Sequence, residues 1–139
     1  MSYEESLRSV SLNADSSLAV YTGVPNTPGA ANPNYGFQYR FVKITGAHQV
    51  GLTTTKASDI AVGVMQNKPQ VSGQAATVAI RGITNVMAGA AVSAGSPVTT
   101  DATGRAIAGT VGTDKCYGIA LAATTGANQL VPVLLNLGL

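Results

Sequence analysis

The stretch Gly89-Ala-Ala-Val-Ser-Ala-Gly-Ser-Pro-Val-Thr-Thr-Asp-Ala-Thr-Gly-Arg105 has glycine, valine or aspartate at every third position. A period of three fits neither a helix (3.6) nor a strand (2). It does fit very short strands separated by tight turns, because glycines such as Gly95 and Gly104 take positive φ angles without steric cost. Asp101 can hydrogen-bond to the backbone two residues on and so start the next turn. The stretch therefore predicts a compact, twice-bent β-ribbon, and it contains no obvious catalytic chemistry.

Short period-two segments lie on both sides of this ribbon. Residues 37–45 alternate, with Phe37, Tyr39 and Phe41 on one face, and a turn at 46–49 followed by a second apolar segment predicts a hairpin. Turn residues recur roughly every ten residues, and no helical period lies between the strands. The pattern predicts an all-β fold, a small barrel or sandwich of short strands.

Two further segments give specific expectations for this fold. The parity of the apolar residues shifts after Gly82, which indicates a bulge or kink at that glycine. The segment from Leu130 to Leu135 is nearly all apolar, which is typical of a strand covered on both faces. Pro132 favours an edge or bulged position for this strand.

The chain divides into three parts by composition: an N-terminal arm at 1–20, a loop rich in Pro, Asn and Gly at 21–36, and a β domain at 37–139. The alternating apolar residues of the arm can join the domain's own sheet or pair with an edge strand of a neighbouring protein. The arm is terminal, serine-rich and separated from the domain by the loop, which favours the second arrangement. The residues predicted to contact a partner are Leu7, Val10, Leu12, Asn32, Asn34 and Tyr35.

The composition favours association with other protein. The 139 residues correspond to one domain, and only 10% of them are charged, against roughly 25% in ordinary soluble domains. With aromatic residues at 5%, no Trp and 16 Gly, the core is built of small side chains that each bury little apolar area. A monomer is expected to be marginally stable, and association can supply the missing burial. A secreted or fibrous β-protein is the alternative that fits the same composition.

Several classes of partner are disfavoured. The net charge is +2 and the basic residues are dispersed, so we expect no nucleic-acid binding. No apolar run approaches the ~20 residues of a transmembrane helix, so no membrane association is expected. The start of the chain, Met1 to Glu5, lacks the features of a signal peptide, which predicts synthesis in the cytoplasm.

Catalytic and metal-binding chemistry is also not indicated. One histidine, His48, and one cysteine, Cys116, cannot assemble a zinc site or a supported nucleophilic site. No phosphate-binding glycine motif is present. Lys115 follows Asp114 as in biotinyl or lipoyl carrier domains, but it comes after the glycine turn rather than before it. We therefore expect no enzyme activity, no metal and no cofactor.

Five stretches, in the same order, resemble the decoration, or cement, proteins of tailed bacteriophages. The resemblance covers about residues 40–135. The stretches are Arg40-Phe-Val-Lys-Ile-Thr-Gly46, Ala61-Val-Gly-Val-Met-Gln-Asn-Lys-Pro69, Val78-Ala-Ile-Arg-Gly82, Ala88 through Arg105, and Val131-Pro-Val-Leu-Leu135.

The resemblance implies a β-rich, clip- or tulip-like fold and a homotrimer at three-fold positions of a phage head. It implies binding of the major capsid protein on the outer surface of the capsid, stabilisation of the shell after expansion, and no catalytic residues. Such a protein would be made in the host cytoplasm and act as part of the virion. A receptor- or glycan-binding phage fibre or surface domain is the alternative function, since it would share the Gly/Thr/Ala-rich β composition.

Overall fold

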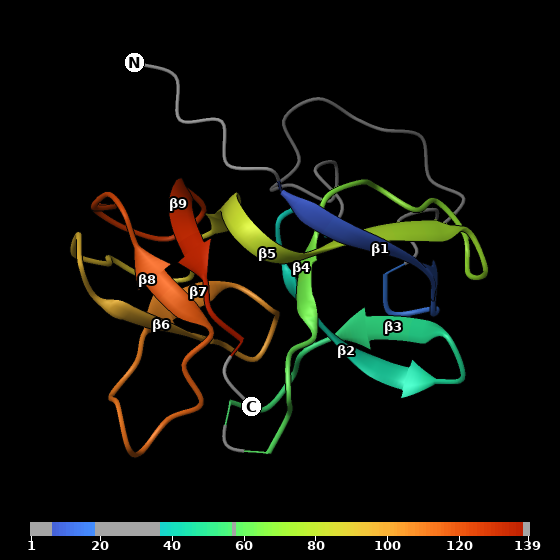
Figure 1. Ribbon diagram of the computed structural model, residues 1–139, viewed down its shortest axis with the longest axis horizontal. Coiled ribbons are helices and arrows are strands. Elements are labelled where there is room, and N and C mark those ends of the chain that lie inside the picture. The colour runs from blue at the N-terminus through green and yellow to red at the C-terminus, as the bar shows by residue number, and fades with distance from the viewer. Residues whose placement is uncertain (1–6, 19–36, 57, 138–139) are drawn as a thin grey trace.

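The computed structural model describes residues 7–18, 37–56 and 58–137. Within these ranges the chain forms strands and no helix (Figure 1), which confirms the predicted all-β fold. The strands are β1 (Arg8–Ala14), β2 (Phe41–Gly46), β3 (Gln49–Leu52), β4 (Gly63–Met65), β5 (Ala75–Met87), β6 (Pro97–Thr100), β7 (Ala106–Ala108), β8 (Gly118–Ala120) and β9 (Leu130–Leu135).

Strands β1, β3, β2, β4 and β5 form a closed barrel, here called the first ring. They pair in that order, and β1 pairs back to β5. Period-two alternation places the inward side chains of all five strands in one apolar cluster. The cluster is Ala14, Leu18, Val42, Val50, Met65, Ala76 and Val78.

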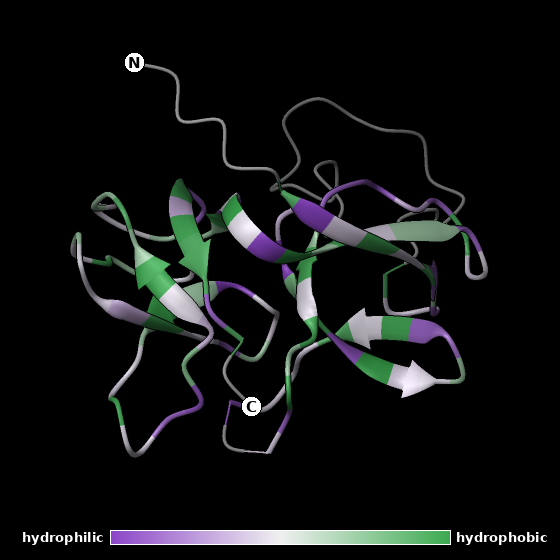
Figure 2. Cartoon of the chain, viewed as in Figure 1, coloured by the Kyte–Doolittle hydropathy of each residue, from purple (hydrophilic) through white to green (hydrophobic). Residues whose placement is uncertain are grey.

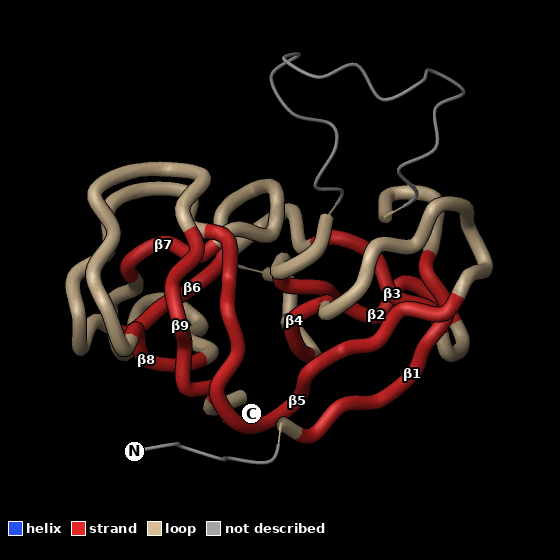
Figure 3. Tube along the Cα trace, turned by 90° about the horizontal axis from the view of Figure 1, so that it is seen from above, coloured by secondary structure: helices blue, strands red, loops and turns tan. Residues whose placement is uncertain are grey.

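The second ring is built on the other half of β5, which pairs in turn with β9, β8, β6 and β7. A parallel bridge between Ala88 and Ala106 joins β7 back to the chain that leaves β5 and closes this ring. Its core includes Val86, Val98, Val131 and Val133. The two rings are therefore two lobes that share one long strand, as Figures 1 and 3 show.

The rings also share core. Phe41, Val64 and Ala79 are cross-strand neighbours on the first ring, yet they pack in the cluster of the second ring. The Phe41 ring lies 5.4 Å from the Tyr117 ring, centroid to centroid. These side chains project outward from the first ring and form part of the core of the second ring.

Gly82 marks the point where β5 passes from one ring to the other. Its φ of 102° lies in the region that favours glycine. Strands β1 and β4 pair with β5 before Gly82, whereas β9 pairs with it from Gly82 onward. The predicted kink at Gly82 is confirmed.

The ribbon of residues 89–105 also folds as predicted, into short extended pieces between tight turns. Gly95 and Gly104 have φ angles of 82° and 76°. The Asp101 carboxylate accepts hydrogen bonds from the Thr103 N–H at 2.8 Å and the Arg105 N–H at 2.9 Å, which fixes the turn before β7. Pro97, the first residue of β6, takes the strand-start position that its missing N–H allows.

The predicted hairpin is confirmed as β2 and β3, but its predicted start is wrong. Phe37 to Tyr39 form a turn, and Tyr39 has a φ of 62°. The Tyr39 N–H donates to the Met65 carbonyl at 2.7 Å, and the Tyr39 carbonyl accepts from the Met87 N–H at 2.8 Å. Backbone hydrogen bonds to the last residue of β4 and the last residue of β5 thus override the local alternation of residues 37–41.

The preference for an arm that reaches a neighbour is corrected for residues 8–14. These residues form β1, an antiparallel partner of β5 and a parallel partner of β3 in the same chain. Ala14 is buried in the first ring and Leu12 packs against the same cluster. Because these apolar side chains are buried within the chain itself, β1 closes the first ring instead of pairing with a neighbouring protein. The predicted loop at 21–36 lies outside the described residues.

Candidate partner-binding surface

Strands β8, β9 and the second half of β5 present an apolar outer side, here called the outer apolar face. Ile119 lies opposite Leu134, and Leu134 lies opposite Ile83 on β5, so these three side chains form one row. Leu130 and Met87 lie opposite each other and form a second row, four residues along β9 from Leu134. Figure 2 shows β8 and β9 largely in the hydrophobic colour.

The outer apolar face is exposed. Leu130, Leu134, Ile119 and Leu121 are 47%, 38%, 46% and 45% exposed. The opposite side chains of β9, among them Val131 and Val133, are fully buried in the second ring. The prediction that β9 is covered on both faces is therefore wrong for the single chain, since only one face is covered. The outward positions remain apolar all the same.

No charged residue occupies the outward positions of this face between Ile83 and Met87 on β5 or along β9. Asn85, opposite Pro132, is the polar exception. Contiguous apolar patches on a protein surface mark sites of contact with another protein. The signal was present in the sequence as an uninterrupted apolar run, but its outward half could be recognised only once the pairing was known.

The predicted contact residues fall in three different situations. Leu7 and Val10, at the start of β1, are each 39% exposed and remain available to a partner. Leu12 instead packs against the core of the first ring. The other predicted contact residues, Asn32, Asn34 and Tyr35, lie outside the described residues.

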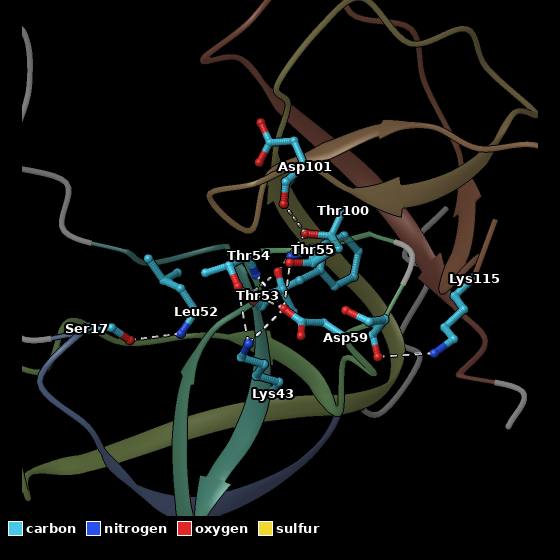
Figure 4. Close-up of polar contacts among 12 residues, drawn as sticks. Ser17, Lys43, Leu52, Thr53, Thr54, Thr55, Asp59, Thr100, Asp101 and Lys115 are labelled. Atoms are coloured by element: carbon cyan, nitrogen blue, oxygen red, sulfur yellow. Dashed lines mark hydrogen bonds and ion pairs between the residues drawn. The ribbon is translucent and has the colours of Figure 1, made fainter.

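A polar junction joins the loop before β4 to its surroundings (Figure 4). The Asp59 carboxylate accepts hydrogen bonds from Lys43 Nζ at 2.8 Å and from the N–H groups of Thr54 and Thr55 at 2.6 and 2.9 Å. Burial alone would raise the pKa of Asp59, but these donors outweigh it and lower that pKa to about 2. Asp59 is therefore a charged anchor of the loop.

The junction extends across the two rings. The Tyr117 hydroxyl of the second ring donates to the Asp59 carbonyl at 2.8 Å. The hydroxyls of Thr53 and Thr100, both fully buried, lie 2.6 Å apart and join the rings directly. Satisfied buried polar groups of this kind fix geometry, so the role of this cluster is structural.

The described residues offer little catalytic chemistry. No group of three or more His, Cys, Asp and Glu residues that could hold a metal lies within these ranges. His48 is exposed in the β2–β3 turn with a φ of 54°. Burial and the nearby Asp114 raise the pKa of the Cys116 thiol, which disfavours the thiolate that a nucleophile requires. No helix in the described ranges could cross a membrane.

Residues 38–135 match the model of the phage cement proteins. The chain belongs to this family. In this cement-family chain, the matched region contains the whole of the second ring and every strand except β1.

The chain is also similar in structure to the head fiber gp8.5 N base of bacteriophage phi29. The TM-score is 0.62, the sequence identity is 16%, and the match covers 94% of the cement-family chain and 95% of the phi29 chain. At this identity the likeness shows a shared fold. No curated protein matches the sequence.

Proposed function

We propose that this chain decorates and stabilises a phage head by binding the major capsid protein as a trimer on the outer surface of the capsid. The observation that carries the proposal is the outer apolar face, an exposed and nearly uncharged patch on a chain of the cement family. A decoration protein needs such a face, because it must remain folded alone and gain burial on the shell.

The energetics fit this role. Full burial of one large aliphatic side chain contributes ~1.5–3 kcal/mol. Leu130 and Ile119 are 47% and 46% exposed in the single chain, so a substantial part of that gain is still available on binding. When linked subunits bind together, modest affinities combine into strong attachment. A trimer of such chains therefore holds several capsid subunits with few contacts each.

The capsid-facing side also includes the start of β1 in this proposal. Strands β8, β9, β5 and β1 are paired in succession and lie along one side of the molecule (Figure 3). Exposed Leu7 and Val10 lie at the β1 end of this run. The predicted contacts of Asn32, Asn34 and Tyr35 remain part of the proposal.

The test uses heads assembled without this protein, mixed with the purified full chain and sedimented. We expect the wild type to co-sediment, and Leu134→Lys to bind at least tenfold more weakly, since a charge then enters the apolar face. Val111→Lys is the matched control, because Val111 is 75% exposed on a loop outside the face and its replacement should leave binding unchanged. Equal binding of wild type and Leu134→Lys would remove the face from the proposal.

The trimer and the alternative function are tested with the same protein. Light scattering in solution and on-particle imaging should show three copies together. The alternative is a receptor- or glycan-binding surface domain, for which the chain would bind host cells and not heads. Binding to cells without binding to heads would decide for that alternative.

A further inference from the structure

Two arginines lie directly opposite each other on β1 and β5. The register places Arg8 opposite Arg81, and both side chains are exposed. Like charges at opposed positions of an antiparallel pair are destabilising. This arrangement therefore has a cost to the free protein and requires an explanation.

The pair is an exception among the eight basic residues of the chain. Three of the others form ion pairs, two donate to backbone carbonyls, and Lys68 also has an interaction within the chain. Within the described ranges, the side chains of Arg8 and Arg81 have neither an ion pair nor a hydrogen bond. The engaged pairs are Lys43–Asp59, Lys56–Asp114, Arg105–Asp101, Arg40 with the Thr103 carbonyl, and Lys115 with the Ser58 carbonyl.

A β-bulge produces this opposition. Ser9 lies opposite Ala79 and Arg8 opposite Arg81, so Ile80 has no partner on β1 and the register shifts by one residue. Bulges re-aim the side chains next to them and recur at functional positions. Gly82, with its φ of 102°, follows at once and turns β5 into the second ring.

Within the described part of the chain, no carboxylate pairs with these arginines. Three of its aspartates form the ion pairs given above. The fourth, Asp15, accepts hydrogen bonds from the N–H and hydroxyl of Ser17 at 2.8 and 2.6 Å. A second copy of these residues would offer only Asp15, whose carboxylate is already held by Ser17, so a different protein is the better source.

We propose that Arg8 and Arg81, next to exposed Leu7, form a docking site for a carboxylate-bearing segment of the major capsid protein. This inference rests on the proposed function and names the chemistry of its partner. Guanidinium groups bind carboxylates in bidentate geometry. A partner carboxylate would relieve the repulsion of the pair, while Leu7, which is 39% exposed, would be covered beside it.

The site also fits the surface already described. Ile83, two residues after Arg81, begins the outer apolar face. Protein interfaces commonly combine an apolar centre with a polar rim. The arginine pair is then the charged rim of the capsid-facing side, where it guides association and fixes orientation.

The test compares Arg8→Glu/Arg81→Glu with wild type in co-sedimentation with heads assembled without this protein. We expect at least a tenfold loss of binding, and wild-type binding that weakens as salt is raised from 50 to 500 mM, values chosen so that screening spans a wide range. Thr113→Glu is the control for a single added acidic side chain, since Thr113 is exposed on a loop away from β1. It should bind like wild type.

The single variant Arg8→Glu separates docking from folding. It places a glutamate opposite Arg81, so the melting temperature should rise or stay unchanged while head binding falls. A variant that melts lower and binds less would show a structural role and overturn the inference. Unchanged binding by the double variant would also overturn it, while binding of the wild type to heads would leave the proposed function standing.

Two other sources of negative charge, the chain's own glutamates and nucleic-acid phosphate, are tested separately. If Glu4→Gln/Glu5→Gln lowers the melting temperature and Arg81→Gln adds nothing further, the arginines are neutralised within the chain and the inference fails. If the wild type binds duplex DNA at 150 mM salt and the double variant does not, the site takes phosphate and the inference fails. Absence of both effects supports a capsid carboxylate.

Discussion

At Gly104 a side chain would enter space held by the backbone of β2. A Cβ there would lie 2.7 Å from the Phe41 carbonyl oxygen, and the residue has a φ of 76°. We expect Gly104→Ala to lower the free energy of unfolding by about 3 kcal/mol, from the strained φ and the overlap together. Gly112→Ala is the matched control, because Gly112 has a φ of 87° and no atom within 4 Å of such a Cβ. It should cost only about 1 kcal/mol in urea denaturation.

Asp59 makes part of the stability pH-dependent. Its pKa is about 2 in the folded chain, against an ordinary 3.8. A lowered folded-state pKa stabilises the protein fully above the ordinary value, and this contribution is lost as the pH falls from about 4 through 2. Asp59→Asn should lower stability at pH 7 and flatten the loss of stability between pH 4 and 2. Equal slopes for both proteins in that range would contradict this.

Individual residues with a local conformational role could be predicted from the sequence. Gly82, Gly95 and Asp101 each act through their own backbone or the next few residues, so their roles are visible in the local sequence. Tyr39 could not be predicted, because its left-handed conformation depends on hydrogen bonds to Met65 and Met87. The same applies to the arginine pair, which exists only through the register of β1 with β5.

At the scale of elements, the same change should cost much more stability on the buried face of β9 than on its exposed face. Val133→Ser introduces a hydroxyl into the second ring, where Val133 is fully buried, and should lower the free energy of unfolding by about 2–4 kcal/mol. Leu134→Ser changes an outward side chain and should cost less than about 1 kcal/mol. Thermal melting of both variants provides the measurement. A large loss in Leu134→Ser would mean that the outer apolar face is covered within the chain.

The existence of most strands could be predicted from the sequence, but their surroundings could not. Alternation shows which residues share a face, and it cannot show whether a face is covered. The nearly continuous apolar run of β9 therefore predicts two covered faces, and the serine-rich start of the chain favours pairing with a neighbour. In the structure β9 has one covered face, and β1 completes the first ring.

At the scale of the whole molecule, we expect the two rings to unfold together. They share β5, the core side chains around Phe41 and Tyr117, and the buried hydroxyl pair of Thr53 and Thr100. Neither ring can lose β5 and stay closed. Differential scanning calorimetry should give one transition with equal calorimetric and van't Hoff enthalpies. Two separated transitions of the wild type would show that the rings are independent. A single wild-type transition that Thr53→Val/Thr100→Val splits into two would show that these hydroxyls are the main link between the rings.

The two-ring arrangement itself could not be predicted from the sequence. Its defining contacts join distant segments, such as β1 with β5 and the Phe41 N–H with the Gly104 carbonyl at 2.7 Å. Short strands with similar small side chains specify many possible pairings, and local patterns do not choose among them. The family resemblance implies a β-rich, clip- or tulip-like fold, and it does not show that one strand serves two barrels.

The shared strand also governs how the chain reaches its native state. The first ring closes only when Arg8–Ala14 meet a strand that begins at Ala75, and the second closes only when the same strand meets Leu130–Leu135. Both closures join residues that are far apart along the chain, and such topologies fold in milliseconds to seconds rather than microseconds. During synthesis the pairing of Arg8–Ala14 with β5 must wait until Arg81 has left the ribosome. Both closures therefore wait for the middle of the chain, and the second also waits for Leu130–Leu135.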